Sequence, residues 1–138
     1  MSETHTPKAG KVEVAVVARD LDASVRFYAD TLGLPHVGDM ELPNGLMKRY
    51  LYGDTIIKVI GFDEPPALSG PGGMMAGVTG FRYITFAVDD VAATQKKFED
   101  AGYTIAVPAF EFMPGLFIAI VEDPDGNWVE FVPANAGS

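Results

Sequence analysis

The chain contains no cysteine among its 138 residues. This absence excludes disulfide bridges and every metal site that uses thiolate ligands. Basic residues are also few: 10 lysines and arginines stand against 19 aspartates and glutamates, and the formal net charge is -9. Because nucleic acids and anionic membrane surfaces are bound through positive charge, the composition argues against both as partners. It leaves a small molecule as the expected ligand.

Long apolar runs and targeting signals are missing as well. No stretch is long enough to span a bilayer, and MSETHTPKAG at the start lacks the basic residues and apolar core of a signal peptide. On these grounds we expect a cytoplasmic protein. The length of 138 residues, of which 48% are hydrophobic, predicts a single domain with a substantial core.

What the chain does contain is an internal repeat with a period of about seventy residues. VEVAVVARDLDASVRFYADTLGL, beginning at Val12, parallels RYITFAVDDVAATQKKFEDAGY, beginning at Arg82. Each copy opens with an alternating apolar strand, passes an aspartate into an amphipathic helix, and ends that helix at a glycine. Three further strands follow in each copy, joined by short turns. The pattern predicts an α+β fold of two modules, each with one strand, one helix and three strands.

The repeat also sets the expected boundaries. Module one spans residues 11–62 and module two spans residues 81–133. The connecting loop, residues 63–80, is rich in proline and glycine and is either a plain linker or a lid. Its two methionines suit contact with an apolar ligand. The tails, residues 1–10 and 134–138, are predicted to be flexible.

The stretch VEDPDGNWVEFV, from Val121 to Val132, places a carboxylate inside a strand. Asp-Pro-Asp-Gly is a turn sequence, because proline fixes φ and glycine reaches positive φ, so the flanking residues form a hairpin. In the second strand of this hairpin, alternation puts Trp128 and Glu130 on the same face. A glutamate beside a tryptophan on a strand is either part of a ligand site or one half of a buried ion pair.

This doubled unit resembles the vicinal oxygen chelate superfamily, also called the glyoxalase, bleomycin-resistance and dioxygenase superfamily. The resemblance rests on DLDASVRFYADTLGL in the first copy and VEDPDGNWVEF in the second, and it covers nearly the whole chain between the tails. It implies two tandem βαβββ modules forming a U-shaped or barrel-like mixed sheet around a central cavity, with the helices outside. It also implies a homodimer, either swapped, with sites shared between chains, or side by side, with complete sites.

Metal-dependent members of the superfamily place four ligands inward, one on the first and one on the last strand of each module. The matching positions in this chain are Glu13, Lys58, Tyr83 and Glu130. A protonated lysine has no lone pair to offer a metal, and a neutral tyrosine coordinates poorly, so the set departs from the usual histidine, glutamine and glutamate. The departure predicts no cofactor, with a divalent metal on Glu13 and Glu130 as the alternative.

Pairing across the predicted hairpins extends the inward face of module one, because directly opposed residues share a face. If Gly53 and Asp54 form a two-residue turn, Lys58 lies opposite Arg49. Arg49 in turn lies opposite Met40 across the next hairpin. The inward face of module one is therefore predicted to be cationic, with an apolar methionine wall.

The same pairing in module two places Ala119 and several aromatic residues on the inward face with Glu130. Together the two modules predict these substrate-binding residues: Met40, Arg49, Phe110, Phe112, Phe117 and Trp128. Aromatic residues in strands also fill cores, and this is the simpler interpretation of each. As a set they describe a pocket for a mostly apolar molecule that bears oxygen.

These residues predict an enzyme that moves a proton on a carbonyl compound. Lys58 would stabilise an oxyanion in place of a metal, Tyr83 would donate to the same oxygen, and Glu13 or Glu130 would act as general base. The reaction would be an isomerisation, epimerisation, elimination or cyclisation. Three alternatives stay open: a binding protein of the bleomycin-resistance type, a metal-dependent glyoxalase-like lyase or dioxygenase, and a purely structural ion pair between Lys58 and Glu130.

Overall fold

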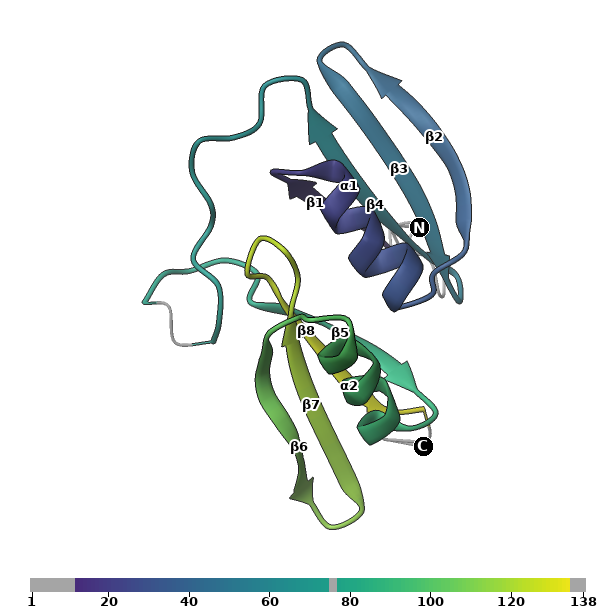
Figure 1. Cartoon of the computed structure of the whole chain (residues 1–138), viewed down its shortest axis with the longest axis vertical. Helices are drawn as coiled ribbons and strands as arrows, with labels where there is room; N and C mark the ends of the chain where they lie inside the picture. Colours follow the sequence, from purple (N-terminus) through teal and green to yellow (C-terminus); the bar gives the residue numbers. More distant parts are fainter. Residues whose placement is uncertain (1–11, 75–76, 135–138) are drawn as a thin grey trace, which may run out of the picture. The chain divides into compact units, whose positions relative to one another are not determined.

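The computed structural model describes residues 12–74 and 77–134 (Figure 1). The predicted flexible tails lie outside these residues, apart from Ala134. None of the helices in the described part of the chain is long and apolar enough to cross a membrane.

The chain divides into two compact units, Met1–Pro66 and Ala67–Ser138, called unit one and unit two below. Each unit contains one copy of the repeat and one four-stranded mixed sheet. Neither sheet closes on itself, since each has two edge strands. The prediction of an α+β fold built from tandem βαβββ modules is confirmed.

Unit one consists of a helix and the strands β1 (Glu13–Ala18), β2 (His36–Leu42), β3 (Gly45–Tyr52) and β4 (Thr55–Phe62). The strand order is β1-β4-β3-β2. β1 runs parallel to β4, whereas β2, β3 and β4 form antiparallel hairpins. A parallel pair requires a crossover connection, and the helix is the first part of that connection.

The helix of unit one comprises α1 (Leu21–Val25) and a π-helical continuation, η1 (Arg26–Thr31). Asp20 caps the helix, because its side chain accepts a hydrogen bond of 3.2 Å from the Ala23 N–H. Beyond the helix, Gly33 adopts φ +89°, a conformation that glycine reaches without strain. The aspartate start and the glycine stop were both predicted; the wider π turns were not.

The core of unit one lies between this helix and one face of the sheet. On the helix side, the buried rings of Phe27 and Tyr28 meet edge to face with centroids 4.7 Å apart. The sheet contributes alternate residues that are equally buried: Ala18, Tyr50, Ile57 and Val59. The opposite face, which carries Glu13 and Lys58, is not covered by this helix and is called the helix-free face of unit one.

Unit two repeats this plan with β5 (Tyr83–Val88), α2 (Val91–Asp100), β6 (Ile105–Met113), β7 (Leu116–Glu122) and β8 (Trp128–Pro133). The strand order is β5-β8-β7-β6, and β5 is parallel to β8. α2 covers one face of the sheet (Figure 1). Its Phe98 is buried against Phe131, with ring centroids 5.3 Å apart. The other face, which carries Trp128 and Glu130, is the helix-free face of unit two.

Candidate functional site

The helix-free face of unit one brings together the two charged residues predicted for it. In the parallel pairing of β1 with β4, Ala15 lies opposite Lys58, and Glu13 lies two residues earlier on the same face. Lys58 Nζ is 2.9 Å from Glu13 Oε1, and the side chains are 28% and 51% exposed, respectively. Lys58 therefore forms its ion pair within its own sheet, and the pair is open to solvent on one side.

Register in unit one confirms part of the predicted face and corrects another part. Gly53 and Asp54 form the two-residue turn, and Arg49 lies opposite Lys58 as predicted. Arg49 is not opposite Met40; it is opposite Gly38, while Met40 pairs with Met47. The observed partner of Arg49 differs from the predicted one because the turn between β2 and β3 consists of residues 43–44 alone, and the next residue already belongs to β3. Met40 still shares the face of Arg49, because the shift is by two residues.

A shallow pocket of about 360 Å³ opens at the edge of this face, where the chain enters β1 and turns from β3 into β4. Its lining residues are Val12, Glu13, Leu51, Gly53, Asp54 and Ile56. Glu13 thus faces both Lys58 and the pocket. The sequence did not predict this pocket, because it depends on how the β3–β4 turn lies beside β1.

The helix-free face of unit two carries the other two predicted residues. β5 and β8 are parallel, with Tyr83 opposite Trp128 and Thr85 opposite Glu130. The Thr85 hydroxyl donates to Glu130 Oε1 at 2.7 Å, which orients the carboxylate and leaves Oε2 for another partner. Tyr83 is 45% exposed. Sequence reasoning missed Thr85, although its spacing of two from Tyr83 places it on the same face.

The predicted register of β7 with β8 is wrong by one residue. Ile120 lies opposite Glu130, whereas Ala119 pairs with Phe131 and is fully buried on the α2 side. Phe117 alternates with Ala119, so it shares the α2 side and not the face of Glu130. A slip of one residue moves every side chain of a strand to the other face.

The longer turn between β7 and β8 accounts for this slip. Asp123, which is 4% exposed, accepts hydrogen bonds of 2.9 Å from the Asp125 N–H, the Asn127 N–H and the Asn127 side-chain amide. These bonds hold a five-residue connection between Glu122 and Trp128, which pair with each other. A tighter two-residue turn would give another register.

Aromatic residues lie on and beside the helix-free face of unit two. Phe110 pairs with Ile118, on the face of Glu130, and its ring meets that of Phe112 with centroids 6.3 Å apart. Trp128 packs against Gly73 of the connecting loop: a Cβ on this glycine would lie 3.4 Å from the indole ring. The described part of the loop thus lies against a residue of this face at Gly73.

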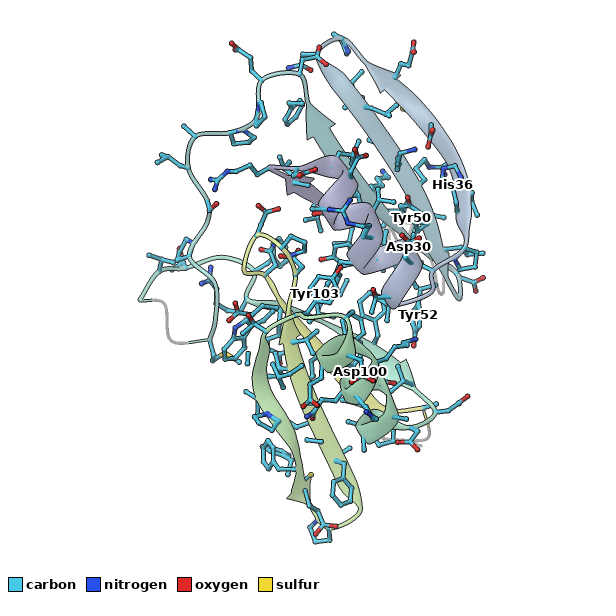
Figure 2. The ribbon with its side chains drawn as sticks, viewed as in Figure 1. Asp30, His36, Tyr50, Tyr52, Asp100 and Tyr103 are labelled. Atoms are coloured by element: carbon cyan, nitrogen blue, oxygen red, sulfur yellow. The ribbon has the colours of Figure 1, made fainter. Side chains whose placement is uncertain are left out.

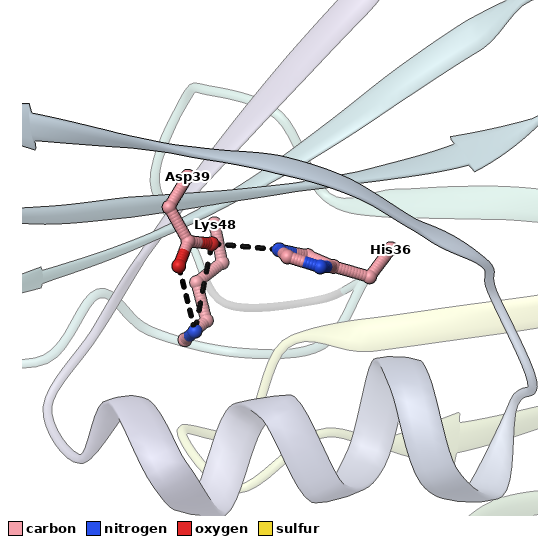
Figure 3. Close-up of polar contacts among 3 residues, drawn as sticks. All are labelled: His36, Asp39 and Lys48. Carbon is pink, nitrogen blue, oxygen red and sulfur yellow. Dashed lines mark hydrogen bonds and ion pairs between the residues drawn. The ribbon is translucent and has the colours of Figure 1, made fainter.

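A polar cluster on the other face of the unit-one sheet was not predicted (Figure 3). His36 Nε2 lies 2.6 Å from Asp39 Oδ1, and Lys48 Nζ lies 3.2 Å from Asp39 Oδ2. The hydrogen bond from His36, with the added charge of Lys48, lowers the pKa of the Asp39 carboxyl. Sequence reasoning had no signal for the cluster, since Asp39 and Lys48 meet only through the register of β2 and β3.

Tyr50 lies next to this cluster, with its ring centroid 5.4 Å from that of His36 (Figure 2). Burial raises the pKa of Tyr50, and the negative charges of Asp39 and Asp30 raise it further. Tyr50 is therefore a neutral phenol in the core, and its ring lies beside that of His36.

The donor chemistry of the four superfamily positions does not fit a catalytic divalent metal. In unit one, an ammonium occupies one position and already binds the carboxylate at the other. In unit two, Glu130 is accompanied by a phenol. Among the described residues, no three histidine, aspartate or glutamate side chains gather closely enough to hold a metal. A metal would have to displace Lys58 from Glu13, at the cost of leaving a half-buried ammonium beside a cation.

Comparison with known proteins places these observations in a family. The sequence model of the Glyoxalase/Bleomycin resistance protein/Dioxygenase superfamily matches residues 12–131. A lactoylglutathione lyase of Haemophilus influenzae is 30% identical over 122 residues, which cover 82% of this chain and 84% of that enzyme. A probable lactoylglutathione lyase of Synechocystis sp. is 29% identical over 118 residues, which cover 85% and 89% of the two chains.

The fold is also that of a solved structure. The glyoxylase/bleomycin resistance protein/dioxygenase domain from Frankia sp. EAN1pec superimposes with a TM-score of 0.77 over 96% of each chain. At 20% sequence identity this similarity is evidence for the fold alone.

Proposed function

Because the chain belongs to the glyoxalase/bleomycin resistance protein/dioxygenase superfamily, we propose that it is a small-molecule enzyme that transfers a proton on a carbonyl compound without a metal. The observation that carries the proposal is the Lys58–Glu13 ion pair of 2.9 Å. It puts a fixed positive charge where metal-dependent relatives have a ligand. An ammonium there performs one task of the metal, which is to stabilise negative charge on oxygen.

In this proposal Lys58 is the electrostatic stabiliser. An ammonium has three N–H donors, of which Glu13 takes one and thereby holds the side chain in place. The remaining donors are available to the carbonyl oxygen of the substrate. As the proton leaves the adjacent carbon, negative charge moves to that oxygen, where the ammonium stabilises it more strongly than it stabilises the neutral carbonyl. Tyr83 is the second, neutral hydrogen-bond donor in this proposal.

Glu130 is the general base of the proposed reaction. Glu13 is engaged by Lys58, whereas Glu130 Oε1 accepts a hydrogen bond from a neutral donor, the Thr85 hydroxyl. The C–H bond breaks, its electron pair forms the enolate, and the proton moves to Oε2 of Glu130. Return of the proton to another face or carbon gives an epimerisation or isomerisation, and departure of a leaving group gives an elimination.

Two substitutions test the proposal. Lys58→Met should lower turnover by about 100- to 1,000-fold, as does loss of an oxyanion donor. Glu130→Gln should lower it by about 100- to 10,000-fold, as does loss of a general base. Proton exchange next to the carbonyl is followed by NMR in D₂O, with a panel of aryl ketones, aldehydes and oxo acids.

Lys48→Met serves as the matched control, because it removes the same charge from the other face of the unit-one sheet. Circular dichroism verifies that each variant is folded. The proposal fails if exchange is equal in all variants, or if no compound in the panel exchanges faster with the protein than in buffer.

A second candidate is a binding protein that sequesters its ligand unchanged. The exposed aromatic rings of Phe110 and Phe112, 42% and 60% accessible, favour this alternative because such rings bind planar ligands. Saturable binding of a ligand that is recovered intact, with no dependence of its chemistry on Glu130, would select sequestration over turnover.

The proposal includes a homodimer, which the resemblance to the superfamily implies. Several large apolar side chains of unit two are exposed, and apolar side chains of this kind are available for contact with a second chain. They are Phe81, Tyr83, Phe110, Phe112, Met113 and Phe117.

A further inference from the structure

Arg49 occupies the middle of the helix-free face of unit one. It lies on β3, between Lys58 on β4 and Gly38 on β2, and it is half-buried. The positive charge of Lys58 is matched by Glu13 at 2.9 Å. The guanidinium of Arg49 has no hydrogen bond or ion pair with any residue in the described part of the chain.

The charge balance of this face differs from that of the whole chain. By strand alternation its charged members are Glu13, Lys58 and Arg49, one carboxylate against two cations. The rest of the face is apolar and includes Ala15, Val17, Met40, Met47, Ile56 and Ile60. A chain with a net charge of -9 therefore presents one uncompensated positive charge on an apolar surface. Half-burial of a cation costs free energy unless a partner is supplied, so this arrangement favours an anionic ligand.

The neighbouring strand leaves the guanidinium uncovered. The register of β2 shifts between His36 and Gly38, which is a bulge directly beside Arg49. Gly38 has φ +144°, and a Cβ there would lie 3.8 Å from Arg49 Nη1, so a side chain at this position would contact the guanidinium. Bulges re-aim side chains and recur beside functional sites. Here the bulge and the glycine together keep a cation accessible on an otherwise apolar face.

We propose that Arg49 binds a carboxylate of the substrate, so that the compound undergoing the proposed proton transfer is an oxo acid with an apolar body. This inference rests on the function proposed above. The planar fork of arginine matches both oxygens of a carboxylate, whereas the point charge of Lys58 suits a single carbonyl oxygen. Directly opposed residues of neighbouring strands are about 5 Å apart at Cβ, which suits two groups on adjacent or nearby carbons of one small molecule. A single uncompensated charge matches a monoanionic carboxylate better than a dianionic phosphate.

The test compares phenylpyruvate with methyl phenylpyruvate, in which the ester removes the negative charge and retains the carbonyl and the ring. Phenylphosphonate is the third probe. Binding to the full chain is measured by titration calorimetry, and exchange of the methylene protons of phenylpyruvate and its ester by NMR in D₂O. Arg49→Met keeps a long apolar stem without the charge, Arg49→Lys keeps the charge without the fork, and Lys48→Met is the matched control on the other face of the same strand.

We expect phenylpyruvate to bind wild type more tightly than its ester does. Arg49→Met should weaken phenylpyruvate binding roughly 10- to 100-fold, the usual effect of losing a charge-assisted contact, and should leave the ester unaffected. Arg49→Lys should bind with intermediate affinity. The carboxylate assignment would be overturned by any of four results. Wild type binds acid and ester equally, wild type and Arg49→Met bind the acid equally, the acid does not bind at all, or phenylphosphonate binds more tightly than the acid.

The same experiment separates this inference from the proposed function. Acid binding that depends on Arg49, without exchange that depends on Glu130, would retain the carboxylate site and reject the proton transfer. Exchange that depends on Glu130, with equal rates for acid and ester, would retain the proton transfer and reject the carboxylate site.

Discussion

At the scale of single residues, the proposed chemistry depends on an ammonium, Lys58, at a position where metal-dependent members of the superfamily have a ligand. Lys58 has no lone pair for a metal while it is protonated, and its ammonium is paired with Glu13 at 2.9 Å. The same substitution that removes a ligand position supplies a fixed cation. A histidine at this position would present a lone pair, and the metal mechanism of the superfamily would then be the simpler hypothesis.

The Asp39 cluster leads to a prediction about acid stability. The pKa of Asp39 is lowered from 3.8 because its carboxylate binds His36 and Lys48 in the folded protein. A lowered pKa stabilises the fold above the unfolded-state pKa, and this contribution is lost as pH falls through the lowered value. The stability difference between wild type and Asp39→Asn should therefore be largest above pH 4 and shrink in more acidic solution.

Urea unfolding at a series of pH values measures this difference. Glu41→Gln, on the same strand, is the control for removal of one negative charge. A difference between wild type and Asp39→Asn that stays constant from neutral pH down to pH 2 would contradict the prediction.

At the scale of elements, the turn between β7 and β8 determines which residues of β7 share the face of Glu130. Asp123 holds this turn with three hydrogen bonds of 2.9 Å in a nearly buried setting. Asp123→Ala removes the acceptor of the part-buried hydrogen bonds from the Asp125 and Asn127 N–H groups. The free energy of unfolding should fall by about 3 kcal/mol, which corresponds to loss of several hydrogen bonds to a charged group.

The matched control is Asp54→Ala, in the exposed turn between β3 and β4. It should change the free energy of unfolding by no more than about 0.5 kcal/mol. Chemical denaturation measures both variants. Equal stability of Asp123→Ala and wild type would show that the backbone alone holds the turn.

At the scale of the whole molecule, the prediction concerns assembly. The exposed apolar side chains of unit two, together with the family resemblance, lead us to expect a homodimer in solution. Sedimentation velocity at several concentrations measures the mass, and a monomer throughout would contradict this expectation. Activity as a function of dilution then distinguishes the two arrangements, because a swapped dimer loses activity on dissociation and a side-by-side dimer with complete sites does not.

The sequence by itself determined the architecture of each module. The repeat, the aspartate and glycine that delimit each helix, and the proline and glycine turns are local signals, because they depend on the conformations that individual residues allow. Trp128 and Glu130 also share a face as predicted, since alternation within one strand is local.

Tertiary structure decided which residues of neighbouring strands lie opposite each other. The predicted partner of Arg49 was wrong because the turn between β2 and β3 is formed by residues 43–44. Ala119 was misplaced because the five-residue turn at Asp123 shifts β7 by one residue. The Asp39–Lys48 contact and the open guanidinium of Arg49 likewise arise from pairing between strands. Register depends on turn length and on bulges, and each of these shifts the pairing between strands by whole residues. The alternation of side chains within a single strand therefore does not predict it.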